Sequence, residues 1–176
     1  MLGIFQDWDV NQGNIKGRIV LVAFRAASAV SRMRPLLRWV CLPYVVLYRI
    51  VVEWILGIEL PWRLSVGKGL RLYHGHALVV NDRARIGEGC VLRHCTTIGV
   101  GATSSDFTGD APVIGDHVDI GSNVVIVGQV HVGNHATIGA GSVVISDVPA
   151  YGVAVGNPAK IVRIRTTTAE AHAAVS

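Results

Sequence analysis

The sequence predicts a mainly β chain wound as a parallel β-helix of six-residue repeats, behind a short helical segment. Three observations support this prediction. An aliphatic residue recurs every six positions between Leu60 and Val148, a Gly often follows it, and residues 1–57 lack the repeat. Neither the 3.6-residue period of a helix nor the alternation of a strand produces a period of six. Such a period is typical of a solenoid in which each repeat contributes one short strand and one corner.

The segment before the repeats is expected to form two helices. Asn11 or Asn14 could cap a first helix that runs through Ile19–Ala29, because Asn is a favoured N-cap residue. Pro35 suits the first turn of a second helix, since its fixed φ fits that position. The second helix is expected to end near Gly57.

The same segment is basic and amphipathic, and two interpretations of it stay open. It contains seven cations and three acids among many aromatic and aliphatic residues. Its longest uncharged run, Trp39 to Tyr48, has ten residues with a proline inside, which is too short to span a bilayer. In one interpretation the helices cover the open end of the β-helix and form subunit contacts. In the other, residues 14–57 lie on an anionic membrane surface.

The β-helix is expected over residues 58–165. Three repeats form a coil of 18 residues with a triangular section, and coils stack about 4.8 Å apart, like strands in a sheet. The recurring aliphatic side chain points into the prism, and a small or β-branched residue four positions later shares the interior. The aliphatic positions are Leu60, Val66, Leu72, Val80, Ile86, Leu92, Ile98, Ile114, Ile120, Ile126, Val132, Ile138 and Val144. The smaller inward residues are Ala84, Thr96, Val118, Val124, Ala136 and Ser142.

Two irregularities interrupt the repeat. Leu78 and Val79 are two extra residues between repeats, and a bulge at a corner is expected there. A polar excursion, the loop 100–112, breaks the ladder of aliphatic residues. A loop that costs a solenoid some of its core stacking is usually functional. Residues 166–176 follow the last repeat and are expected to form a flexible tail.

Composition narrows the classes of function. A chain of 176 residues suits one compact domain with a small appendage. Three cysteines suggest no disulfide framework, and no signal peptide is visible, so a reducing cytosol is expected. The net charge of +4 favours anionic partners. We expect no nucleic-acid binding, because neither zinc-finger spacing nor a basic patch interleaved with aromatics occurs.

Three stretches resemble one known family. They are LRLYHGHALVV (Leu70–Val80), APVIG (Ala111–Gly115) and GAGSVVISDVPAYGVAVGNPAKIV (Gly139–Val162). With the repeats, they resemble the left-handed β-helix of the hexapeptide-repeat acyltransferases, in the serine acetyltransferase branch. The stretch LYRIVVEWILG (Leu47–Gly57) looks closer to capsule and colanic-acid polysaccharide O-acetyltransferases. The resemblance implies acetyl-CoA as donor and a homotrimer with sites between subunits.

The resemblance also implies a catalytic base. An acceptor hydroxyl must lose a proton as it attacks a thioester, and His is the side chain that suits this task near neutral pH. Of seven histidines, His74 in LeuTyrHisGly stands at the catalytic position of the family. Glu59 precedes it in the sequence, at the place where the family usually has a partner Asp. Its carboxylate would accept a bond from one imidazole nitrogen and hold the other toward the hydroxyl.

Residues near His74 indicate the acceptor. His94 follows one full coil later, once the two extra residues are subtracted, so the two rings should lie on one face. Whether His94 lines the groove or binds acceptor stays open. Serine acetyltransferases carry Asp at the place of Tyr73 and an Arg-His pair at the place of Asp110 and Ala111. Their absence argues against serine, whereas an aromatic such as Tyr73 can pack against a sugar ring.

For the donor, the resemblance implies a groove between two adjacent β-helices. Backbone groups near Gly99, Ser122, Gly139 and Ala140 would hold CoA. The segment from Asn157 to Arg163 would close over the nucleotide, with Lys160 and Arg163 near the phosphates. These cofactor-binding residues and the acceptor residues Tyr73, His94 and Asp110 complete the candidate site, for which no metal is expected.

The sequence therefore predicts an acetyl-CoA-dependent O-acetyltransferase acting in bacterial exopolysaccharide or capsule biosynthesis. The acceptor is expected to be a sugar or a lipid-linked oligosaccharide. The expected location is the cytoplasm, and in the second interpretation of residues 14–57 the protein lies on the inner face of the membrane. A serine O-acetyltransferase of cysteine biosynthesis is the alternative.

Two classes from outside the acetyltransferases are more distant. A zinc carbonic anhydrase would need three histidines from two subunits. Its ligand pair separated by four residues is missing, since three residues separate His131 from His135. The second class is a non-catalytic β-helix that serves as a scaffold.

Overall fold

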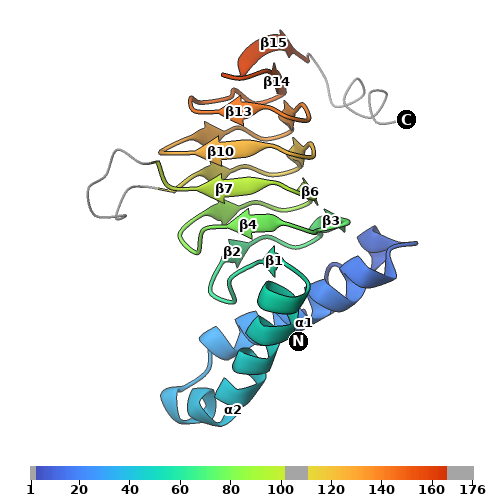
Figure 1. Cartoon of the computed structure of the whole chain (residues 1–176), viewed down its shortest axis with the longest axis vertical. Coiled ribbons are helices and arrows are strands. Elements are labelled where there is room, and N and C mark those ends of the chain that lie inside the picture. Colours follow the sequence, from blue (N-terminus) through green and yellow to red (C-terminus); the bar gives the residue numbers. More distant parts are fainter. Residues whose placement is uncertain (1–2, 102–110, 166–176) are drawn as a thin grey trace.

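The computed structural model describes residues 3–101 and 111–165. A β-helix stands on a pair of helices at its N-terminal end (Figure 1). This confirms the predicted fold class, a mainly β parallel solenoid with a short helical segment. The tail 166–176 and the predicted acceptor residue Asp110 lie outside the described residues.

The β-helix has three parallel sheets, one for each side of the prism. Sheet A runs in the order β1 (Ile58–Glu59), β4 (Leu78–Val80), β7 (Thr97–Gly99), β10 (Val125–Val127) and β13 (Val143–Val144). Sheet B contains β2 (Ser65–Val66), β5 (Arg85–Ile86), β8 (Val113–Ile114) and β11 (His131–Val132). Sheet C contains β3 (Arg71–Tyr73), β6 (Val91–Arg93), β9 (Asp119–Ile120), β12 (Thr137–Ile138), β14 (Gly152–Val155) and β15 (Lys160–Ile164). All neighbouring strands pair in parallel except β14 and β15, which form a terminal hairpin.

The interior of the prism is filled as the repeat predicts. Every recurring aliphatic residue is buried, and so are the six smaller residues four positions later. The two polar members of the smaller set bond the backbone: the Thr96 hydroxyl donates to the Gly121 carbonyl at 3.1 Å, and Ser142 Oγ accepts from the Gly156 amide at 3.1 Å. A hydroxyl can therefore occupy this narrow core without an unsatisfied polar group.

The two extra residues lie at a corner, but earlier than predicted. Leu72 of β3 pairs with Leu92 in the next coil, and Val80 of β4 pairs with Ile98. More residues separate Leu72 from its partner than separate Val80 from its partner. The coil is therefore already lengthened before β4 begins, in the turn from His74 to Ala77. Leu78 instead belongs to β4 and is fully buried, so the prediction of a bulge at Leu78 and Val79 was wrong in position. The repeat fixes how many residues are added, but not where the backbone absorbs them.

The N-terminal segment forms a short 3-10 turn, η1 (Asp9–Asn11), and helix α1 (Ile15–Ser31). Helix α2 (Pro35–Tyr48) follows and continues as a π-helix, η2 (Arg49–Ile55). Asn14 is the N-cap of α1, and its Oδ1 accepts from the Gly17 amide at 2.9 Å. Pro35 begins α2 as predicted, and Pro43 lies inside the helix without ending it.

The helical segment covers the first coil of the β-helix with polar as well as apolar contacts. Val20, Leu21 and Phe24 share one hydrophobic core with the inward residues of the β-helix. Asn11 holds the edge of β3: its Oδ1 accepts from the Leu72 amide at 3.0 Å, and its Nδ2 donates to the Leu70 carbonyl at 2.8 Å. These side chains stand where a neighbouring strand would stand.

A buried ion pair fastens the same edge. The Asp7 carboxylate accepts from the Leu70 amide at 2.9 Å and from Arg25 Nε at 2.7 Å. The Arg25 guanidinium also donates to the Val66 carbonyl at 2.8 Å. Both charged groups are almost fully buried, so each needs the other to offset its lost hydration.

Candidate active site

One edge of the prism carries most of the residues that the sequence singled out. We call it the C–A corner, the edge where the chain turns from sheet C to sheet A in each coil. Backbone hydrogen bonds join the successive turns: the Asn123 amide donates to the His94 carbonyl at 3.2 Å, and the Gly141 amide donates to the Ser122 carbonyl at 2.9 Å. The corner thus brings His74, His94, Ser122 and Ala140 into one column.

His74 and His94 are neighbours in this column, as the spacing predicts. Their ring centroids lie 5.8 Å apart with an interplanar angle of 76°, so the rings meet edge to face. His74 is exposed and His94 is half-buried. His94 Nδ1 is buried and has no hydrogen-bond partner among the described residues. Since buried polar atoms are nearly always bonded, this nitrogen is an exception within the single chain.

The backbone of His74 lies in the left-handed region, with φ 65°. Such a conformation often marks an active site. Six other non-glycine residues in the described part of the chain share it, among them Cys95 and Asn123 at the same edge. The left-handed backbone is therefore a property of the corners of this prism, and it carries no weight for catalysis.

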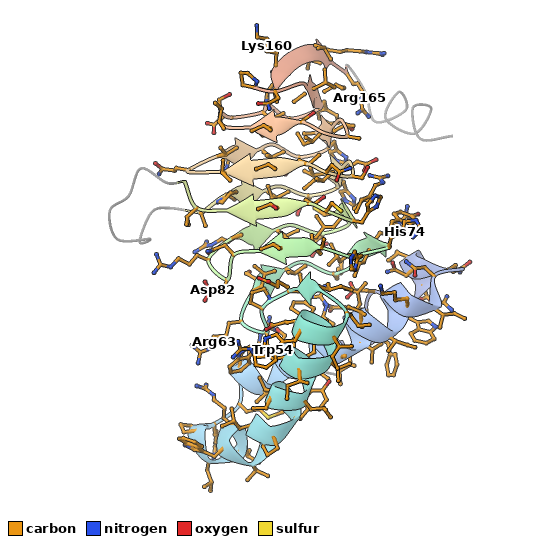
Figure 2. The ribbon with its side chains drawn as sticks, in the orientation of Figure 1. Trp54, Arg63, His74, Asp82, Lys160 and Arg165 are labelled. Atoms are coloured by element: carbon orange, nitrogen blue, oxygen red, sulfur yellow. The ribbon has the colours of Figure 1, made fainter. Side chains whose placement is uncertain are left out.

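Glu59 is not brought to His74 within one chain. Glu59 in β1 pairs with Val79 in β4, and His74 lies in the turn before β4. In the part of the chain that the structure describes, no hydrogen bond or ion pair joins the Glu59 and His74 side chains. Instead Glu59 lines a groove of about 790 Å³ between α2 and sheet A, together with Arg49, Trp62 and Asp82. Figure 2 shows Asp82 on the side of the molecule opposite His74. The spacing between Glu59 and His74 in the sequence does not reveal which way a strand residue points.

Beside His74, sheet C presents a charged and aromatic surface that the sequence reasoning missed in part. The Arg93 guanidinium lies over the Tyr73 ring, 5.6 Å from its centroid. The same guanidinium forms an ion pair with Asp119 and donates to the Ile120 carbonyl at 2.9 Å. Tyr73 and Arg93 are strand partners one coil apart. The same offset of one coil that relates His74 to His94 could have identified Arg93.

The predicted CoA residues separate into two places. Ser122, Gly139 and Ala140 lie at the C–A corner, whereas Gly99 ends β7 at the other edge of sheet A, where the loop 100–112 begins. Around Gly99 no described atom lies within 4 Å of an added Cβ. At Gly139 an added Cβ would meet the Val155 side chain at 2.7 Å. Packing thus explains the glycine at 139, whereas no described atom requires a glycine at 99.

The terminal hairpin places the last predicted residues at the far end of the solenoid. Asn157, Lys160 and Arg163 are exposed. Figure 2 shows Lys160 at the opposite end of the β-helix from His74. From β3 to β14 the strand spacing amounts to about 19 Å. An extended molecule lying along the C–A corner is needed to reach both residues.

The remaining histidines have other surroundings. His76, which stands at a normally small inward position, is turned outward, with its ring beside Gly57. His117 and His135 stack at 5.0 Å, and His135 stacks on Tyr151 at 4.9 Å. Within residues 3–101 and 111–165, no group of three or more His, Cys, Asp or Glu side chains is placed to hold a metal ion.

Comparison with known proteins identifies the family. A family model described as "Bacterial transferase hexapeptide (six repeats)" matches residues 111–146. The chain is 32% identical over 162 residues to WcaB of Escherichia coli (strain K12), whose name assigns it to colanic acid biosynthesis as an acetyltransferase. That match covers 90% of this chain and 98% of WcaB.

Solved structures agree with the fold. The soybean serine acetyltransferase apoenzyme has a TM-score of 0.76 and 28% identity, over 89% of this chain and 66% of that one. A serine acetyltransferase from Brucella abortus strain S19, in complex with coenzyme A, has a TM-score of 0.77 and 26% identity, over 94% of this chain and 66% of that one. The chain belongs to the hexapeptide-repeat transferases, and it is an acetyltransferase. Since both kinds of relative match at similar identity, the acceptor has to be argued from the site.

Proposed function

We propose that this protein transfers an acetyl group from acetyl-CoA to a sugar hydroxyl of a bacterial exopolysaccharide or capsule. The observation that supports this acceptor most directly is the surface beside His74 and His94. There Tyr73 and Arg93 stack, and Asp119 pairs with Arg93. An aromatic ring next to paired charges suits a neutral, hydroxyl-rich ring, because the apolar face of a sugar packs on the aromatic side chain and its hydroxyls bond the polar groups.

The proposed chemistry needs one base and no covalent enzyme intermediate. His74 takes the proton of the acceptor hydroxyl while the oxygen attacks the thioester carbonyl carbon. The C–S bond then breaks, and the imidazolium returns its proton to the departing thiolate. The role of Glu59 as the partner of His74 stays a prediction, because the single chain does not join them. The His94 ring lies 5.8 Å from that of His74, which supports a contact with acceptor or thioester as part of the proposal.

Acetyl-CoA as donor is supported by the Brucella abortus structure in complex with coenzyme A, which has the same fold. In this chain, the small residues Ser122, Gly139 and Ala140, which follow His74 and His94 along the C–A corner, support the same donor. Because acetyl-CoA is a cytoplasmic metabolite, the proposed place of action is the cytoplasm.

A homotrimer is proposed from the outer faces of the prism. On sheet A the outward residues include Val79, Val125, Val127 and Val143, and Ile145 follows directly with 58% of its surface exposed. Sheet B presents mainly polar residues, such as Ser65, Arg85 and His131. The C–A corner and Gly99 lie at opposite edges of sheet A. Two adjacent chains of a closed ring could bring one of each to a single CoA.

Serine is the second candidate acceptor, since solved relatives are serine acetyltransferases. The two candidates are separated by measuring CoA thiol release with L-serine and with a panel of sugars and glycolipids. We expect release with a sugar or glycolipid and no stimulation by serine. Stimulation by serine alone would overturn the proposed acceptor and leave the acetyltransferase activity standing.

A further inference from the structure

The outer side of α2 and η2 is apolar and uncovered. We call it the α2 face, and its most exposed large side chains are Leu36, Trp39, Val40, Leu47, Trp54 and Ile55, which are 56% to 80% exposed. Together, Pro35–Ile55 form a continuous helix of 21 residues that by length and composition could cross a membrane. Only 17% of its most apolar stretch is buried inside the protein. Contiguous apolar surface of this kind marks an interaction site.

The exposed charges at the start of the α2 face have one sign. Between Asp9 and Glu53 the sequence has no acid and seven cations, of which Arg25 is paired with Asp7 and Arg49 with Glu53. Arg32 and Arg34 are exposed in the turn between α1 and α2, directly before the exposed Leu36. Long cationic side chains beside an apolar surface are suited to anionic lipid, because their stems pack with the apolar groups while their charged ends reach the headgroups.

The contacts of α2 with the rest of the protein indicate a helix that lies on a surface and does not cross it. The Tyr44 hydroxyl donates to the Ala23 carbonyl of α1 at 3.0 Å, and the Tyr48 hydroxyl donates to the Leu60 carbonyl of the β-helix at 2.6 Å. Arg49 and Glu53 form an ion pair at 3.0 Å near the end of the helix. The helix is thus fixed along one side, with charges at both ends and its apolar side outward.

The same charges argue against a second copy of the chain as the occupant. A parallel or three-fold arrangement of α2 faces would bring the equivalent exposed Arg32 and Arg34 side chains of different chains together. Like charges gathered at an interface repel one another and lose hydration. An anionic bilayer instead supplies the opposite charge to each of them.

We infer that the α2 face docks this protein onto an anionic phospholipid bilayer as a peripheral membrane protein. Docking has a consequence for the active site that rests on the proposed function. Helix α1 packs against β3, and His74 directly follows the last residue of β3. Figure 1 shows that the helices lie at the end of the β-helix where β3 begins sheet C. The candidate base would therefore act on acceptors held close to the bilayer, such as a lipid-linked oligosaccharide.

Vesicle flotation of the purified full chain tests the docking. The probes are phosphatidylcholine vesicles with and without one third phosphatidylglycerol, at low and high salt. We expect flotation with the anionic vesicles only, weakened at least tenfold by 0.5 M NaCl, since salt screens the attraction. Fluorescence of the exposed Trp39 and Trp54 should shift to shorter wavelength on binding.

The double variant Trp39→Gln with Val40→Gln should lose flotation at least tenfold and keep its thermal transition. Its matched control is Val162→Gln with Ile164→Gln, two residues about 60% exposed at the far end of the molecule, which should float like the wild type. Absence of flotation in the wild type, or equal loss in both double variants, would overturn the inference. A fall in sedimenting mass of the Trp39 and Val40 variant would instead show that a second copy covers the α2 face. Thiol release with soluble acceptors tests the proposed function separately, because it requires no vesicle.

Discussion

The β-helix and the helical segment are both rich in aliphatic residues, yet they expose them to very different degrees. Leu60, at the start of the ladder, is completely buried, whereas Leu36 in α2 is 80% exposed. In the solenoid each inward side chain is covered by the coils above and below it, so the period of six alone specifies burial. A helix needs a partner surface, and α1 supplies it on one side of α2 only. The difference teaches that composition indicates burial only where the repeat also supplies the partner.

The largest expected effect is on catalysis at the coil nearest the helices. His74→Ala should lower turnover by roughly 10²- to 10⁴-fold, because the hydroxyl loses its base. The temperature of thermal unfolding should stay unchanged, since His74 is exposed. Thiol release under saturating acetyl-CoA measures the effect, and Glu59→Gln should cost less because Glu59 bonds no histidine within the described part of one chain. Activity retained in His74→Ala would move the base to His94.

The contact between the two regions should be the next most sensitive point. Asp7→Ala should lower the free energy of unfolding by about 3–5 kcal/mol, because Arg25 then stays buried without its counter-charge. Urea unfolding followed by circular dichroism gives the value. Glu53→Ala is the control, since it breaks the partly exposed pair with Arg49, which should contribute about 1 kcal/mol or less. Equal losses in the two variants would show that the Asp7 pair does not fasten the regions.

Matched truncations test the comparison directly. Ile120→Ala, inside the prism, should lower the free energy of unfolding by about 2–5 kcal/mol, because it removes buried methylene groups and leaves a cavity. Leu36→Ala on the α2 face should change it by about 0.5 kcal/mol or less. A large loss for Leu36→Ala in dilute solution would mean that another chain covers this residue.

The smallest expected effect is a dependence on alkaline pH to which Cys90 of the β-helix contributes. Burial raises the pKa of the Cys90 thiol to about 11. Between the pKa of the unfolded thiol, near 8.5, and this value, the folded chain keeps a proton that the unfolded chain loses. The free energy of unfolding should therefore fall as pH rises above about 9, by at most about 1.4 kcal/mol per pH unit.

Urea unfolding at pH 8, 9 and 10 measures this slope. Cys90→Ala should remove it, and Cys41→Ala, in the exposed helix, should leave it in place. A slope that persists in Cys90→Ala would assign it to another group, such as Tyr48, whose phenol pKa burial also raises.

The same contrast explains what the sequence could and could not predict. The inward residues, the cap at Asn14 and the start at Pro35 follow from local rules, so these predictions are confirmed by the structure. The two extra residues were misplaced because periodicity counts residues between strands without locating them. Arg93 was missed because the coil offset was applied to His74 alone. The separation of Glu59 from His74 depends on the direction of an outward side chain, which spacing in a motif does not encode.

The side chains of Asp7, Asn11 and Asn14 have a consequence beyond stability. They occupy the amides and carbonyls of Leu70 and Leu72, at the edge of β3, that a further strand would otherwise use. At the other end, β15 runs antiparallel to β14 and so interrupts the parallel stacking. A solenoid with two open ends can add copies of itself indefinitely, as fibrils do. Here both ends of the β-helix are closed, which keeps a self-complementary architecture from polymerising.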